Sequence, residues 1–115
     1  MRDCLFCKLV TREIPTEIVF ESDTVFAFTD IDPQAPHHVL IIPKKHIPTL
    51  NDLSAAEDSG LVSELVLTAT KIARELKIDE SGYRLLFNCN AEGGQVIFHI
   101  HLHLLGGRQM NWPPG

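Results

Sequence analysis

Hydrophobic and polar residues alternate most regularly near the C-terminal end of the chain, where residues 98–105 read Phe-His-Ile-His-Leu-His-Leu-Leu. Side chains along a strand point alternately to its two faces. The segment therefore predicts a strand with one apolar face, and three histidines on the other face: His99, His101 and His103. Because a strand that packs on a core ordinarily uses Val, Ile or Leu, a row of imidazoles that titrate near neutral pH indicates a functional face.

A single metal ion does not account for this row. Side chains two positions apart on a strand are separated by about 6.6 Å, and those four apart by about 13 Å. Neighbouring histidines of this kind can bind zinc, but all three cannot easily converge on one ion. We therefore expect the three imidazoles to have different roles.

The hydrophobic period changes in the middle of the chain. Ser54 followed by Glu57 is a capping-box signal. Apolar residues then recur at helical spacing: Leu61, Leu65, Ala69, Ile72 and Leu76. The pattern predicts one long helix over residues 55–77.

Shorter segments complete the predicted fold. Asp3 is a candidate N-cap for a short helix over residues 4–10. Runs rich in β-branched and aromatic residues predict four further strands, at 17–21, 24–29, 38–42 and 83–89. This order predicts an α+β fold: an antiparallel sheet of about five strands with one long helix and a short N-terminal helix, in a single domain over residues 1–115.

Composition and charge narrow the class of protein. The chain is 44% hydrophobic and 22% charged, which is typical of a globular domain. It has neither the apolar run of about 20 residues that a membrane helix needs nor a signal-peptide core. The net charge of −5 argues against a nucleic-acid surface. We expect a soluble cytoplasmic protein with neither a membrane nor a nucleic acid as partner.

Three cysteines, an odd number, do not suggest a disulfide scaffold. Cys4 and Cys7 form a C-x-x-C pair. The pair by itself leaves three interpretations open: half of a zinc site, a redox dithiol, or two inert buried thiols.

Four segments together resemble a known family. The pattern Gly94-Gln95-x-x-x-His99-x-His101-x-His103 is similar to the signature of the histidine triad family of nucleotide hydrolases and transferases. Residues 28–36 and 38–47 resemble the nucleotide-binding half of that family. The ending 106–115, Gly-Gly-Arg-Gln-Met-Asn-Trp-Pro-Pro-Gly, resembles the Hint-type purine nucleoside phosphoramidase branch.

This resemblance implies hydrolysis of purine nucleoside 5′-phosphoramidates through a nucleotidyl-histidine intermediate. His101 would be the nucleophile, and a neutral imidazole suits that role. His103 would supply a proton to the leaving amine or bind phosphate oxygens. His38 would line the phosphate pocket, and no catalytic metal is required. The alternatives are a dinucleoside polyphosphate hydrolase of the same family and a zinc-bearing nucleotide-binding scaffold with little turnover.

The resemblance also implies a nucleotide site. Asp30 would bind the ribose hydroxyls, Asn88 the ribose or phosphate, and Gly94 and Gln95 the phosphate. Apolar positions would surround the base: Leu5, Phe6, Leu9, Ile14, Phe28 and Leu40. Close relatives often carry a serine after the Gly-Gly-Gln, where this chain has Val96, so we expect an altered preference for the leaving amine.

Two further implications concern metal and assembly. Some members of the family hold structural zinc with four residues that this chain also has: Cys4, Cys7, His46 and His99. Two thiolates and two imidazoles make a closed tetrahedral site. The family also implies a homodimer in which Trp112 reaches toward the partner's pocket. His37 has no assigned role.

Overall fold

The computed structural model describes residues 3–115. Within this range it contains two α-helices, one short 3-10 helix (η1) and five strands. They follow one another in the order α1 (Leu5–Val10), β1 (Ile18–Glu21), β2 (Val25–Thr29), β3 (His37–Pro43), η1 (Leu50–Asp52), α2 (Ala55–Glu75), β4 (Tyr83–Leu86) and β5 (Leu102–Gly106). The predicted α+β class, with an antiparallel five-stranded sheet, one long helix and one short helix, is confirmed.

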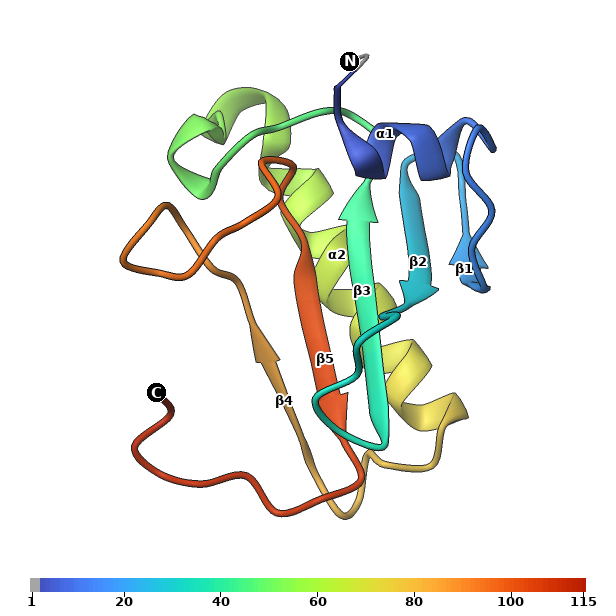
Figure 1. Cartoon of the computed structure of the whole chain (residues 1–115), viewed down its shortest axis with the longest axis vertical. Coiled ribbons are helices and arrows are strands. Elements are labelled where there is room, and N and C mark those ends of the chain that lie inside the picture. Colours follow the sequence, from blue (N-terminus) through green and yellow to red (C-terminus); the bar gives the residue numbers. More distant parts are fainter. Residues whose placement is uncertain (1–2) are drawn as a thin grey trace.

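The strands form one sheet in the order β1-β2-β3-β5-β4, and every pair of neighbours is antiparallel. The longest strand, β3, lies in the middle. Figure 1 shows α2 running behind the sheet, whereas α1 lies across the ends of β2 and β3. One face of the sheet is therefore packed against α2, and one end of the other face is packed against α1. Among the described residues, no helix combines the length and the apolar character needed to cross a membrane.

Alternation along the central strands produces two separate cores. In β3, Val39 and Ile41 belong to the cluster that packs with α2, whereas Leu40 and Ile42 belong to the cluster under α1. Leu104 of β5 pairs with Val39 and joins the α2 core, and His103 pairs with Leu40. The histidine face of β5 is therefore the face that α1 covers at one end. This is the arrangement that the alternating pattern predicts for the strand.

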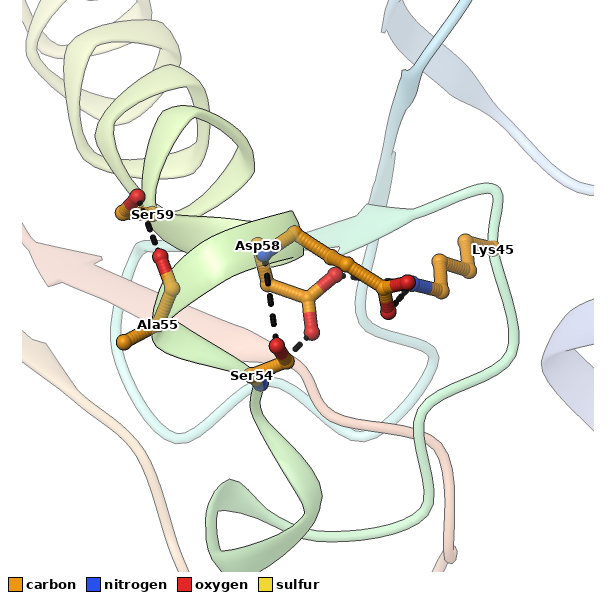
Figure 2. A network of polar contacts seen from close by, with 6 residues as sticks. Lys45, Ser54, Ala55, Asp58 and Ser59 are labelled. Atoms are coloured by element: carbon orange, nitrogen blue, oxygen red, sulfur yellow. Dashed lines mark hydrogen bonds and ion pairs between the residues drawn. The ribbon is translucent and has the colours of Figure 1, made fainter.

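The long helix begins where predicted, but its cap differs in one partner. Ser54 Oγ accepts a hydrogen bond from the Glu57 amide at 3.3 Å. The reciprocal acceptor is the carboxylate of Asp58, which takes the Ser54 amide at 2.8 Å, so the predicted role of Glu57 is wrong. Figure 2 shows why: the buried Asp58 carboxylate points back along the helix between Ser54 and Lys45, whose Nζ lies 2.8 Å from Asp58 Oδ1. This pair ties the segment after β3 to the start of α2.

Other predicted boundaries need correction. The N-cap of α1 is Cys4 rather than Asp3, because Cys4 Sγ accepts the Cys7 amide at 3.3 Å. Helix α2 ends at Glu75, and Lys77 just beyond it has a left-handed φ of 61° that does not continue a helix.

The two C-terminal strands are shorter than predicted. Strand β4 ends at Leu86 and β5 begins only at Leu102, so the strands predicted over 83–89 and 98–105 are each about half regular. The physical reason lies in the segment before β5. The Ile100 amide donates to the Ile47 carbonyl at 2.8 Å and not to a neighbouring strand of the sheet. His99 and His101 therefore lie in irregular chain.

Candidate functional site

A cavity of about 320 Å³ lies beneath α1, between the helix and the sheet. Its walls include all six apolar residues predicted to surround a base: Leu5, Phe6, Leu9, Ile14, Phe28 and Leu40. Its polar groups come from Asp30, at the end of β2, and from His101 and His103. The fold therefore brings nine of the predicted site residues to one cavity, from segments almost a hundred residues apart in the sequence.

Four lining residues were not predicted: Pro15, Thr16, Ile31 and Ile97. Ile31 is 97% exposed and stands at the mouth of the cavity, between two aspartates in the loop after β2. An exposed isoleucine flanked by charged residues is the signal that sequence reasoning could have used.

His101 is oriented by the backbone. Its Nδ1 lies 2.9 Å from the carbonyl oxygen of His99. A carbonyl oxygen only accepts, so we assign the proton of a neutral His101 to Nδ1. Nε2 then keeps its lone pair, which is the form of imidazole that attacks an electrophile. Burial lowers the pKa of His101, against the opposing effect of the His99 carbonyl, and this favours the neutral form.

A pair of histidines, His38 and His103, lies beside His101. His38, which is buried in β3, places Nε2 2.9 Å from His103 Nδ1 and 3.4 Å from Asp30 Oδ2. Nε2 of His103 is buried and has no hydrogen-bond partner within residues 3–115. A buried polar atom without a partner is costly. It marks the place where the site offers a hydrogen bond to a bound molecule.

The same burial sets the charge of this pair. Burial, and next the positive charges of His101 and His38, lower the pKa of His103 to about 4. Burial also lowers the pKa of His38, although the Asp30 carboxylate opposes the shift. Near pH 7 the three imidazoles of the resting site are therefore neutral.

A second cluster brings together the four residues predicted to bind metal: Cys4, Cys7, His46 and His99. Nδ1 of His99 lies 3.3 Å from Cys4 Sγ, 3.5 Å from Cys7 Sγ and 3.2 Å from His46 Nδ1. A tetrahedral zinc ion with ordinary bond lengths separates two nitrogens by about 3.3 Å and a nitrogen from a sulfur by about 3.6 Å. The spacing of the four donors therefore fits that ion.

The outer contacts of His99 agree with a ligand role. Its Nε2 lies 2.8 Å from the Pro43 carbonyl, so Nε2 holds the proton and Nδ1 faces the other donors with its lone pair. A backbone carbonyl on the second nitrogen is a frequent outer contact of metal-bound histidine. Burial lowers the pKa of His99 to about 4, which keeps the imidazole neutral as a ligand must be.

The metal cluster and the cavity share structural elements. Phe6 lies between the two cysteines in sequence, and its ring packs edge-on against His99 and His101 at centroid distances of 5.9 and 5.0 Å. His99 offers its ring to the cluster and its carbonyl to His101. The four-residue cluster thus supports both Phe6 in the cavity wall and His101.

The other predicted nucleotide-binding residues do not line the cavity: Asn88, Gly94, Gln95 and Trp112. Gln95 is buried, and its amide bonds the backbone of Asn90, Pro48 and Ile97, at 2.9, 2.8 and 3.1 Å. Its side chain thus shapes the loop before His99 instead of facing the cavity. Gly94 has a φ of 80°, as a tight turn requires, and Trp112 is 83% exposed in the C-terminal segment.

Comparison with known proteins identifies the family. The sequence matches the HIT domain over residues 11–110. Purine nucleoside phosphoramidase of Escherichia coli K12 is 51% identical over 108 residues, which cover 94% of this chain and 90% of that protein. An uncharacterized HIT-like protein of Synechocystis is 50% identical over 113 residues, which cover 98% and 97%.

Solved structures agree. A HIT family hydrolase from Legionella pneumophila has a TM-score of 0.96 and 57% identity, covering 98% of this chain and 100% of that one. A histidine triad protein from Clostridium difficile has a TM-score of 0.92 and 42% identity, covering 96% of each chain. The family match over most of the chain, with these relatives, shows that the chain belongs to the HIT domain family.

Proposed function

We propose that this protein is a hydrolase that cleaves the phosphorus–nitrogen bond of purine nucleoside 5′-phosphoramidates. One observation carries the proposal: the lone pair of His101 Nε2 is available at a cavity with largely apolar walls, beside Asp30 and His103. The E. coli relative that shares half of the sequence is named for this activity. The apolar walls suit a purine base, and Asp30 is a charged acceptor for ribose hydroxyls.

The chemistry needs one nucleophile and one movable proton. In the first step Nε2 of His101 bonds to the α-phosphorus, the phosphorus–nitrogen bond breaks, and the leaving amine takes a proton. The His38–His103 pair is neutral in the resting site, but the negative charge of a bound phosphate raises its pKa, so that it takes a proton from solvent and delivers it from His103 Nε2. In the second step water attacks phosphorus, the bond to His101 breaks, and the proton lost by water passes to the same pair.

The test is to trap the intermediate. Rapid quench of the protein with adenosine 5′-phosphoramidate, followed by peptide mass spectrometry, should find AMP on His101. His101→Ala should abolish both the adduct and turnover. His37→Ala, which removes a histidine of β3 outside the cavity, serves as the matched control and should retain both. Full hydrolysis by His101→Ala would contradict the proposal, and faster turnover of diadenosine polyphosphates would change the assigned substrate.

We also propose that Cys4, Cys7, His46 and His99 hold one structural zinc ion. The donor spacing and the Pro43 carbonyl on His99 support this assignment. Four protein ligands leave no position for substrate, so the ion would have no part in catalysis. Its contribution would be to hold the start of α1, with the base wall, against the segment before β5.

Elemental analysis of protein purified without metal-affinity tags should find about one zinc ion per chain. The double variant Cys4→Ser with Cys7→Ser should lose it. Cys89→Ser, which changes the one cysteine outside the cluster, should keep it. Wild-type protein that is fully folded and free of metal would refute the site.

We further propose a homodimer that binds AMP-like nucleotides and works in the cytoplasm. Strand β4 is an edge of the sheet, and beside it Arg84 Nη2 donates to the Asn111 carbonyl at 2.8 Å. Trp112, next to Asn111, is exposed and does not line the cavity of its own chain. Light scattering should give the mass of two chains, and a monomeric mass would contradict the dimer.

The proposed location is tested by cell fractionation, which should find the protein in the cytoplasmic fraction.

A further inference from the structure

The segment after β5 contacts the loop between β2 and β3. Gly107 turns the chain there, with a φ of 92°, and packs so closely on Pro36 that a Cβ atom would lie 2.9 Å from Pro36 Cβ. The next residue, Arg108, is exposed and donates from Nε to the carbonyl of Gln34 at 3.0 Å. Arg108, whose side chain lies outside the cavity, thus fixes the position of the Gln34 carbonyl in the loop.

Gln34 also contacts a histidine of the candidate site. The amide of Gln34 donates to His38 Nδ1 at 3.0 Å. Because an amide nitrogen only donates, Nδ1 must accept, and the proton of a neutral His38 is on Nε2. Nε2 in turn faces His103 Nδ1, which then accepts, so the proton of a neutral His103 is on the unpartnered Nε2.

Packing alone holds this loop weakly. Residues 31–34 are all exposed, and Ala35 is the one buried residue between Asp30 and His37. Pro33 restricts φ at its own position but leaves ψ free to turn the next amide. The polar contacts of Gln34 therefore decide the direction in which its amide points: Arg108 on its carbonyl, and its own side-chain amide on the Asp32 carbonyl at 3.0 Å.

We propose that Arg108 is a positioning residue for the proposed reaction. It holds Gln34 so that the backbone amide fixes the tautomer and ring orientation of His38, and through His38 presents the Nε2 proton of His103 to the substrate. The inference rests on the proposed function for its catalytic consequence. The hydrogen bonds from Arg108 to Gln34, from Gln34 to His38 and between His38 and His103 are present without substrate, so they can be tested separately.

Arg108→Ala is the test variant, and Arg74→Ala is its matched control. Both arginines are exposed, but Arg74 lies on α2, outside the loop, the cavity and the edge strand β4. Because Arg108 is exposed, its removal leaves both cores unchanged. Nitrogen NMR of the imidazoles at neutral pH reports the tautomers directly, and hydrogen exchange reports the Gln34 amide.

For wild type and Arg74→Ala we expect His38 to accept at Nδ1 and the Gln34 amide to be protected. In Arg108→Ala we expect that acceptor signal to be lost and Gln34 exchange to rise about tenfold. We also expect kcat on adenosine 5′-phosphoramidate to fall about three- to tenfold at unchanged KM, the effect of one charge-assisted hydrogen bond.

Two results would overturn the inference: unchanged His38 tautomer and kcat in Arg108→Ala, or an equal loss in Arg74→Ala. If wild type does not hydrolyse the phosphoramidate, the proposed function fails. The NMR comparison then still decides whether Arg108 sets the tautomers.

Discussion

Acid should destabilise this fold in part through His103. The pKa of His103 is lowered to about 4 in the folded protein by burial and by the neighbouring histidines, whereas an unfolded chain has a histidine pKa of about 6.5. Between these values the unfolded state binds a proton that the folded state does not. The free energy of unfolding therefore falls as pH decreases through this window. Above about pH 6.5 His103 is neutral in both the folded and the unfolded state and causes no loss of stability.

The magnitude follows from the two pKa values. Lowering the pH from 7 to 5 costs about 2 kcal/mol for one group with this shift, and still about 1.5 kcal/mol if the folded pKa is 5. His103→Asn keeps a polar group that can meet His38 but removes the titration. We therefore expect the stability of this variant to fall by about 1.5 to 2 kcal/mol less than that of wild type over the same interval.

Urea unfolding at pH 7 and pH 5, for both proteins, measures this difference. Far-UV circular dichroism is the suitable probe, because the single tryptophan, Trp112, is 83% exposed and reports little of the core. Comparing the change in each protein cancels the titration of groups common to both, including the cluster of Cys4, Cys7, His46 and His99. If both lose stability equally to within about 0.5 kcal/mol, the buried neutral state of His103 is refuted.

Four further substitutions test the packing and the cavity wall. Gly93→Ala should destabilise the protein by about 1 to 3 kcal/mol, because the new Cβ would lie 2.5 Å from the Cys89 carbonyl oxygen. Gly60→Ala, in open space on α2, should instead stabilise the protein by about 0.5 to 1 kcal/mol. Thermal unfolding of both variants measures this contrast. Phe6→Leu should raise KM for the phosphoramidate about tenfold with a smaller effect on kcat, because Phe6 lines the cavity; an unchanged KM in steady-state kinetics would contradict that wall. Leu104→Ala, in the α2 core, should cost about 2 to 5 kcal/mol in urea unfolding, and a loss below 1 kcal/mol would contradict the packing.

Local patterns in the sequence were sufficient for much of the fold. The apolar period of residues 61–76 predicts α2 because that period depends only on neighbours along the chain. The alternation at His103 and Leu104 predicts the two faces of β5 for the same reason. The family resemblance, which the HIT domain match confirms, supplied the residues that the fold brings to the cavity and to the four-residue cluster.

The sequence was a poorer guide wherever the partner of a polar group lies far along the chain. Nothing near Ser54 indicates that Asp58 would complete its cap, because that choice depends on Lys45 approaching from the segment after β3. Nor does the Gly-Gly-Gln pattern reveal that the Gln95 amide is occupied by backbone groups.

The histidine row contains both kinds of information. Its spacing by itself determined that chemistry belongs on this face, since alternation is a property of the backbone. Only the tertiary structure decided which nitrogen of each imidazole holds the proton, because that proton goes to the nitrogen that faces an acceptor. Pro43 selects that nitrogen in His99, the His99 carbonyl selects it in His101, and these groups meet only once the chain has folded.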